Sequence, residues 1–460
     1  MKSKIILLGV LFAVLLAKVT AEEKIKYHYP TEPEVVKTLT EWQDWKFGMF
    51  IHWGTYSQWG IVESWSICPE TYDWILRSRP DSISYFKYLQ KYEALKNTFN
   101  PVKFNPSKWA EAAKYAGMKY VVFTTKHHDG FNMFDTKFSD YKISDKNCPY
   151  HTNPNANIAK SLFEAFRQSG LRTGAYYSIS DWHSNDFWWD RFPPKDRGIN
   201  YPADMFPKKL QAFNDFVNNQ LDELTGGNYG KLDMLWFDLC SVGAPLQWDR
   251  FAKTIRGNQP GAMMVARHTG NNYENYITPE NKIPDETFDH PWEACITMAG
   301  SWSYVPKDQY RTTRKLLDIL VQIVSRGGNL LLNVGPGPDG ELHAEAYQRM
   351  HEIGDWMNIN SDGIYGTKPV APYREAKLKF TKKGNVVYSF YVSDEKEAEL
   401  PAKVFINSFK PKAGSKVFLM GYDKPLQWTY NGTGVYIDVP ESVCKTPPCD
   451  YIWCFKMQVK

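Results

Sequence analysis

The sequence predicts an α/β fold, a (β/α)8-like barrel followed by a C-terminal antiparallel β-sandwich. Short apolar runs alternate with amphipathic stretches from about residue 40 to 360, which is typical of a barrel of parallel strands. Several of these runs end in ionisable side chains, and a barrel keeps its active site at the carboxyl ends of its strands. Beyond about residue 366 the pattern changes to runs with a period of two, which is typical of antiparallel strands.

The expected barrel strands are short and apolar: Phe47–Ile51, Tyr120–Thr124, Thr173–Ser178, Met234–Phe237, Met263–Ala266 and Leu330–Val334. Helices are expected between them over 106–117, 158–168, 208–224 and 341–358, and several of these segments end at glycine. A doubly wound open sheet is the competing architecture. No Gly-x-Gly-x-x-Gly follows an early strand, so a dinucleotide-binding fold is disfavoured.

The expected domain boundary is the proline-containing segment 366–372, so the catalytic barrel is predicted over 22–365 and the β-sandwich over 366–460. Strand-like runs separated by turn residues support the sandwich. They are Val386–Val392, Lys403–Ile406, Lys416–Met420, Val435–Val439 and Tyr451–Val459. A bracing role is favoured for this domain over glycan binding.

Residues 1–21 have the pattern of a signal peptide, with Lys2 and Lys4 before the apolar run Ile5–Ala17 and small residues before Glu22. The apolar run is too short to span a membrane. No later segment approaches 18 apolar residues, so no membrane span is expected. A secreted, periplasmic or lysosomal destination is predicted.

The composition excludes several classes of function. The formal charge of +4, from 55 basic and 51 acidic residues, gives no reason to propose nucleic acid as a partner. Seven cysteines leave at least one thiol unpaired within the chain, and Cys444 and Cys449 are spaced to close a small loop under oxidising conditions. No spacing resembles a zinc site, so no metal or cofactor is expected. No Gly-x-Ser-x-Gly motif supports a serine hydrolase.

Asp238 is the strongest candidate for chemistry, because a carboxylate after a buried strand is costly unless it is paired, hydrogen-bonded or used. Glu280 and Glu293 are candidate partners, and retaining glycoside hydrolysis uses two carboxyl groups about 5–5.5 Å apart. Three histidines at predicted strand ends indicate a common site. The groups suited to sugar hydroxyls and sugar rings are His52, Trp65, His127, His128, Tyr177, Trp236 and Arg267.

Five motifs together carry a family resemblance: Lys46–Gly54, Lys126–Phe131, Leu235–Asp238, Trp292–Cys295 and Gly328–Pro336. In this order they resemble the α-L-fucosidases of glycoside hydrolase family 29. The resemblance implies a barrel followed by a β-sandwich. It also implies a retaining exo-enzyme that removes terminal α-L-fucose from glycans or glycoconjugates through a covalent fucosyl-enzyme intermediate.

The resemblance also implies residue roles. Asp238 matches the nucleophile, and Arg267 with Thr278-Pro-Glu280 resembles an arginine–glutamate pair of one large subgroup. Glu280 is therefore the first candidate for the acid/base, and Glu293 is the second. His52, His127 and His128 match fucose-hydroxyl ligands, and Trp65, Tyr177, Trp236 and Arg267 fit sugar contacts by the same analogy. Members often have Glu-Trp-Tyr where this chain has Glu63-Ser-Trp-Ser66, which leaves the contact by Glu63 open.

Two other functions compete with this interpretation. One is a catalytically silent fucose-binding protein on the same barrel, and the other is a retaining glycosidase for a related sugar such as an α-galactoside. The presence of Asp238 and both glutamates favours an enzyme. The sequence leaves the fucosyl linkage, the natural glycan and the oligomeric state open.

Overall fold

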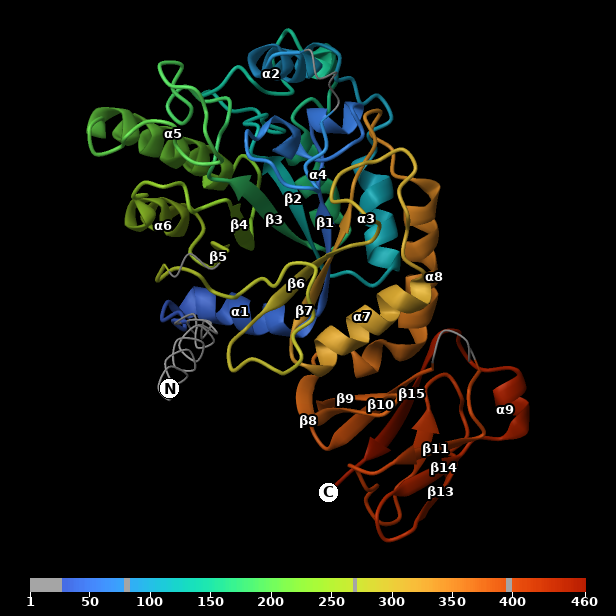
Figure 1. Cartoon of the computed structure of the whole chain (residues 1–460). Helices are drawn as coiled ribbons and strands as arrows, with labels where there is room; N and C mark the ends of the chain where they lie inside the picture. Colours follow the sequence, from blue (N-terminus) through green and yellow to red (C-terminus); the bar gives the residue numbers. More distant parts are fainter. Residues whose placement is uncertain (1–26, 78–82, 268–270, 394–398) are drawn as a thin grey trace, which may run out of the picture.

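The computed structural model describes residues 27–77, 83–267, 271–393 and 399–460. A curved parallel sheet surrounded by helices is followed by two antiparallel sheets (Figure 1). The expected signal peptide at 1–21 lies outside the described residues.

Seven parallel strands form the curved sheet in the order β5-β4-β3-β2-β1-β7-β6. They are β1 (Phe47–Ile51), β2 (Tyr120–Lys126), β3 (Arg172–Ser178), β4 (Met234–Asp238), β5 (Met263–Val265), β6 (Glu293–Thr297) and β7 (Asn329–Val334). Almost every residue in them is buried, as expected for parallel strands covered on both faces. β6 was not predicted from the sequence.

The segment 275–280 bridges the edge strands β5 and β6. Asn275 donates its backbone N–H to Met264 O at 2.8 Å, and Glu293 donates its N–H to Ile277 O at 2.9 Å. An isolated parallel bridge joins Glu280 to Cys295. With this eighth extended element, the predicted barrel-like fold is confirmed.

Helices surround the sheet (Figure 1). They are α1 (Pro33–Trp45), α2 (Tyr85–Glu93), α3 (Pro106–Tyr115), α4 (Ile158–Gln168), α5 (Pro207–Thr225), α6 (Trp248–Asn258), α7 (Thr313–Ser325) and α8 (Ala344–Asn360). Short 3-10 helices are η1 (Thr55–Gln58), η2 (Ser64–Ile67), η3 (Ala94–Asn97), η4 (Pro149–Thr152) and η5 (Ser361–Gly363).

α4 illustrates why these segments are helical. The side chain of Asn157 accepts a hydrogen bond from Lys160 N at the start, and Gly170 follows the end with φ +85°. Leu162, Phe163 and Phe166 share the buried face, so tertiary packing supplies most of the stability of this short helix.

The C-terminal part contains two antiparallel sheets, as predicted. The larger has the order β12-β15-β10-β9-β8 and the smaller β11-β14-β13. The elements are β8 (Lys368–Glu375), β9 (Leu378–Lys383), β10 (Val386–Val392), β11 (Lys403–Ile406), β12 (Val417–Leu419), β13 (Gln427–Tyr430), β14 (Val435–Asp438), α9 (Glu441–Lys445) and β15 (Ile452–Gln458). Residues of both sheets, including Phe380, Ile437 and Phe455, share one hydrophobic core.

The larger C-terminal sheet packs against α7 and α8, on the lower side of the barrel in Figure 1. Trp356 of α8 donates its indole N–H to Ile452 O at 2.7 Å, and Thr381 donates its hydroxyl to Gly363 O at 2.7 Å.

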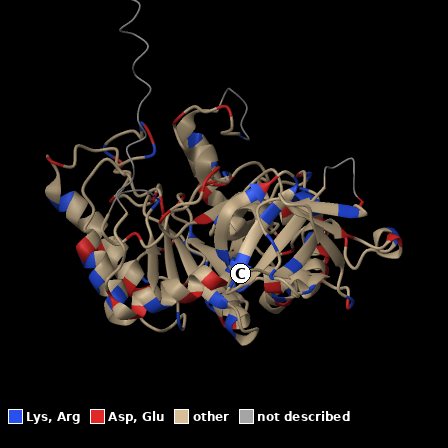
Figure 2. Ribbon diagram, turned by 90° about the horizontal axis from the view of Figure 1, so that it is seen from below, with Lys and Arg blue, Asp and Glu red and all other residues tan. Residues whose placement is uncertain are grey.

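Basic and acidic side chains are interspersed along the outer helices and strands (Figure 2). No described helix is long and apolar enough to cross a bilayer.

Candidate active site

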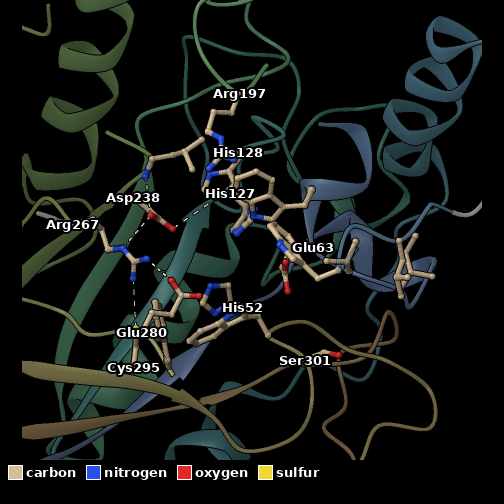
Figure 3. A pocket seen from close by; sticks show the side chains of 18 of the residues that line it. His52, Glu63, His127, His128, Arg197, Asp238, Arg267, Glu280, Cys295 and Ser301 are labelled. Carbon is tan, nitrogen blue, oxygen red and sulfur yellow. Dashed lines mark hydrogen bonds and ion pairs between the residues drawn. The ribbon is translucent and has the colours of Figure 1, made fainter. Parts of the chain in front are cut away.

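A cavity of about 560 Å³ is lined by side chains from the carboxyl ends of the barrel strands and the loops that follow them. This volume lies within the range of about 300–1,000 Å³ that is typical of small-molecule sites. Eight of the ten predicted site residues line it: His52, Trp65, His127, His128, Trp236, Asp238, Arg267 and Glu280. Figure 3 shows the carboxylates and imidazoles pointing into this common space.

Asp238, the last residue of β4, is held in place by three neighbours. Its Oδ2 accepts a hydrogen bond from the Tyr176 hydroxyl at 2.8 Å, and its Oδ1 accepts one from Leu239 N at 2.8 Å. Arg267 Nε lies 3.5 Å from Oδ1. Burial raises the pKa of Asp238, but the charge of Arg267 and these hydrogen bonds hold it below its usual value. Asp238 is therefore ionised at neutral pH.

Arg267 links the two catalytic candidates (Figure 3). Besides its ion pair with Asp238, its Nη2 donates a hydrogen bond to Glu280 Oε2, and its guanidinium lies 5.2 Å from the ring centre of Trp236. Because one guanidinium contacts both, the carboxyl groups of Asp238 and Glu280 face the same part of the cavity. The side chain of Glu280 is 42% exposed, so this carboxyl group can reach a bound ligand.

The tautomer of His52 is fixed by its neighbour. Asn333 donates its side-chain N–H to Trp302 O at 2.7 Å, which leaves its Oδ1 to face His52 Nδ1 at 2.7 Å. Nδ1 of His52 therefore carries the proton, and Nε2 is an acceptor.

His128 has the same tautomer for a similar reason. Ser178 donates its hydroxyl proton to Ser180 O at 2.7 Å, so it accepts from His128 Nδ1 at 2.8 Å. His127 Nδ1 lies 2.5 Å from the hydroxyl of Ser64. Each of these imidazoles is thus oriented by a partner at Nδ1.

All three imidazoles are neutral at physiological pH. Burial lowers the pKa of His52 and of His128 to about 4, and it lowers the pKa of His127 well below its usual value. A proton on His127 would also be repelled by a proton on His128 or His52, which further lowers the pKa of His127. With Nε2 as an acceptor, the neutral rings of His52 and His128 are suited to bind the hydroxyl groups of a sugar.

The cavity also contains polar residues that were not predicted. Glu63 is 4% exposed, and its Oε1 accepts a hydrogen bond from Ser303 N at 3.3 Å. Burial raises the pKa of Glu63 to about 7. The altered motif around Glu63 had left open whether this residue contacts the sugar. Arg197 and Ser301 come from loops whose sequence carries no pattern that could have identified them.

Tyr177, which the sequence predicts to contact the sugar, does not line the cavity. Its hydroxyl donates to Gln220 Oε1 at 2.7 Å and accepts from Lys126 Nζ at 3.1 Å. These partners lie in the layer between the sheet and the helices. Because side chains alternate along a strand, the preceding residue, Tyr176, points inward toward Asp238.

Glu293 does not line the cavity either. It is the first residue of β6, and the carboxyl ends of the strands carry the site. Its side chain is fully buried and accepts hydrogen bonds from Tyr120 OH at 2.5 Å and Trp236 Nε1 at 3.2 Å. Burial raises the pKa of Glu293 to about 7. This carboxyl group belongs to the interior of the barrel below the cavity.

Three non-glycine residues of the site have a left-handed backbone: Leu239 (φ 48°), Arg267 (φ 55°) and Asn281 (φ 47°). Two of them directly follow Asp238 and Glu280. Such conformations cost about 1–3 kcal/mol each and cluster at functional sites.

In the described part of the chain, no group of three or more His, Cys, Asp or Glu side chains is arranged to hold a metal ion.

Two family models match this chain. The family model for α-L-fucosidase matches residues 14–362, and the model for the α-L-fucosidase C-terminal domain matches residues 373–458. The human plasma α-L-fucosidase is 28% identical over 450 residues, which cover 92% of this chain and 90% of the relative.

Two solved structures are similar over almost the whole chain. α-L-Fucosidase isoenzyme 1 from Paenibacillus thiaminolyticus has a TM-score of 0.75 and 29% identity, covering 93% of this chain and 100% of its own. The α-fucosidase of Thermotoga maritima in complex with fucose has a TM-score of 0.70 and 27% identity, covering 90% of this chain and 96% of its own.

Proposed function

The chain belongs to the α-L-fucosidase family, glycoside hydrolase family 29, and we propose that it is a retaining exo-α-L-fucosidase. Its substrate is a terminal α-L-fucose on an oligosaccharide or glycoconjugate. The observation that carries the proposal is the single guanidinium of Arg267, which joins an ionised Asp238 to Glu280 at the edge of one cavity. Two carboxyl groups in one site are what retaining hydrolysis requires.

In the first step, an oxygen of Asp238 attacks the anomeric carbon as the glycosidic bond breaks, and Glu280 gives its proton to the departing oxygen. The product is a fucosyl ester of Asp238. In the second step, Glu280 removes a proton from water while that water attacks the anomeric carbon. The ester bond to Asp238 breaks, fucose leaves, and both carboxyl groups return to their starting states.

The cavity wall supplies the sugar contacts in this proposal. Nε2 of His52 and of His128 accept hydrogen bonds from the sugar hydroxyls, and His127 lies between them, with its ring centre 5.7 Å from that of His52 and 4.1 Å from that of His128. Trp65 provides an apolar face for the C–H groups and the methyl group of fucose. Trp236, which is 1% exposed and lies under the guanidinium of Arg267, supports the cavity wall.

Glu280 is assigned as the acid/base in preference to the other glutamates. Glu293 is fully buried away from the cavity, and a proton donor has to come within hydrogen-bond reach of the leaving group. Glu63 lines the cavity and keeps its proton up to about pH 7. We assign Glu63 to hydrogen bonding of the sugar, because Arg267 joins Glu280 to the proposed nucleophile Asp238.

Release of 4-nitrophenol from its α-L-fucoside tests the proposal, with the α-D-galactoside and the β-D-fucoside alongside. We expect strong release from the α-L-fucoside alone, and its loss in Asp238→Ala. Azide should partly rescue this variant and give the β-fucosyl azide, because azide enters the space of the missing carboxylate. Wild-type activity in Asp238→Ala would refute the nucleophile assignment. A folded wild-type protein that binds L-fucose but releases nothing would support the fucose-binding alternative.

We further propose that residues 1–21 are a signal peptide, that 22–365 form the catalytic domain, and that 366–460 form a bracing domain. The name of the human plasma relative supports a secretory route, and so does the apolar segment near the N-terminus. N-terminal sequencing of the protein exported by its host should start at residue 22.

A further inference from the structure

Three exposed apolar side chains lie together at the mouth of the cavity. Tyr72, Trp74 and Leu76 are 44%, 51% and 53% exposed, and Trp74 and Leu76 line the cavity. We call these three residues the rim cluster. Among the described residues, Trp74 is the only tryptophan of the large exposed hydrophobic side chains. Exposed apolar groups that continue a binding cavity commonly mark a ligand contact.

The rings of the rim cluster are held in fixed positions. Tyr72 and Trp74 stack with ring centres 5.6 Å apart and planes 14° apart, and Trp74 packs edge-on against Trp65 at 5.1 Å. The Tyr72 hydroxyl accepts a hydrogen bond from Arg197 Nη2 at 2.9 Å. The guanidinium of Arg197 also lies 4.9 Å from the ring centre of Trp65.

Arg197 is itself paired, so the rim cluster carries no free charge from it. Its Nε donates to Glu70 Oε1 at 2.8 Å, and its Nη2 donates to Glu70 Oε2. The pair is two-pronged, which fixes the plane of the guanidinium. The charges of Arg197 and Glu70 therefore offset each other, and the guanidinium beside the aromatic rings is fixed.

We propose that the rim cluster is a binding subsite for the sugar to which the fucose is attached. This inference rests on the proposed function and adds the class of leaving group, which is an uncharged pyranose that presents an apolar C–H face. The ring of Trp74 stacks on that face, and Leu76 contacts its edge. The enzyme then prefers fucosylated oligosaccharides over fucosides with small leaving groups.

Two features of the cavity support this occupant. The histidines and Asp238 lie at the strand ends, so the fucose occupies the inner part, and its anomeric oxygen points toward the exposed carboxyl group of Glu280. A cavity of about 560 Å³ has room for more than one pyranose ring. An aromatic side chain offers a large contact area and loses little conformational freedom when it binds a ligand. Stacking of the second sugar on a rigid ring at the mouth of the cavity therefore favours binding.

The test compares two substrates in Trp74→Ala and in the conservative variant Trp74→Phe. One is fucosyllactose, α1,2- or α1,3-linked, whichever the wild type hydrolyses faster, and the other is α-L-fucosyl fluoride, whose leaving group is a single atom. Tyr430→Ala is the matched control, because Tyr430 is also an exposed aromatic residue, at 42%, and lies on β13 in the C-terminal part.

We expect the ratio of kcat/KM for fucosyllactose to kcat/KM for the fluoride to fall about five- to thirtyfold in Trp74→Ala. Trp74→Phe should recover most of it, and Tyr430→Ala should leave it unchanged. Free lactose should inhibit the wild type more strongly than Trp74→Ala. An unchanged ratio, or an equal loss on both substrates, would overturn the inference. If the wild type hydrolyses neither substrate, the proposed function itself is refuted.

Discussion

Tyr176 of β3 donates a hydrogen bond of 2.8 Å to Oδ2 of Asp238 on the neighbouring strand β4. The Tyr176 ring is itself fixed between two aromatic neighbours, with ring centres 5.5 Å from Trp236 and 5.6 Å from His127. The orientation of the proposed nucleophile is therefore set by the packing of the barrel interior. Such preorganisation by a rigid support is what a reacting carboxylate requires.

The first prediction concerns Tyr176→Phe. Removing this donor destabilises the charged form of Asp238 and so raises its pKa, because a hydrogen bond to a carboxylate favours ionisation. Activity requires ionised Asp238, so the acid limb of the kcat/KM profile should move to higher pH. At neutral pH we expect a loss of about tenfold or more, since hydrogen bonds to charged groups contribute about 1.5–3 kcal/mol. A pH–rate profile measures both effects.

Tyr177→Phe is the matched control, because the same atom is removed from the adjacent residue. Its hydroxyl serves buried Gln220 and Lys126 on the outer face of the sheet. We expect a loss of stability of about 1–3 kcal/mol in urea unfolding, with the acid limb unmoved. A shift of the acid limb in Tyr177→Phe rather than in Tyr176→Phe would show that the alternation of the two tyrosines is assigned the wrong way round.

The second prediction separates the glutamates by leaving group. Glu280→Ala should lose about 10²–10⁴-fold in kcat/KM on substrates with poor leaving groups, since these need protonation. It should lose much less on 4-nitrophenyl fucoside or fucosyl fluoride. Glu293→Gln should keep the wild-type dependence on the leaving group, because its side chain does not reach the cavity. If Glu280→Ala is impaired equally on all these substrates, Glu280 is not the acid/base.

The sequence predicted every strand of the parallel sheet except β6, but it did not show which face of a strand each side chain occupies or how the loops enter the cavity. β1 ends at Ile51 as expected, since its apolar run stops at His52. Two consecutive tyrosines satisfy a period of two equally well in either phase, so only the packed sheet shows that Tyr176 faces inward. β6 begins with an acidic residue and was not predicted, so the sequence did not indicate that Glu293 lies at the amino end of a strand. Glu63 and Arg197 enter the cavity through tertiary contacts that local patterns do not encode.

The third prediction concerns the stability of Glu293→Gln. Burial raises the pKa of Glu293 from 4.5 to about 7 in the folded protein, so the folded state holds a proton that the unfolded state releases above about pH 4.5. The stability of the wild type is thus full below that pH and is lost as the pH rises through 7. The loss from this group is about 3 kcal/mol. Glutamine does not titrate.

Urea unfolding at pH 5 and pH 8 measures this difference. Glu293→Gln should lose less stability than the wild type between the two values. Part of the slope should remain, because burial also raises the pKa of Glu63 to about 7 and that of Asp129 to about 6. The same pH dependence in variant and wild type would mean that Glu293 is ionised in the folded protein.

The fourth prediction tests the tautomer of His52. Asn333→Ala removes the acceptor that holds the proton on Nδ1 of His52, so the ring is free to rotate and to present an N–H to the substrate instead of a lone pair. We expect KM for 4-nitrophenyl α-L-fucoside to rise about tenfold, corresponding to one lost hydrogen bond of about 1.4 kcal/mol. The effect on kcat should be smaller, since His52 does not take part in bond breaking.

Asn329→Ala is the control for this variant, because Asn329 lies on the same strand, is equally buried, and donates its side-chain N–H to Trp42 O at 2.7 Å at the opposite end of the barrel. Both variants lose a buried amide and should be destabilised to a similar extent. Only Asn333→Ala should raise KM. A similar rise in both variants would mean that KM reports general loosening of the barrel, and an unchanged KM in Asn333→Ala would mean that the other neighbours of His52 suffice to orient it.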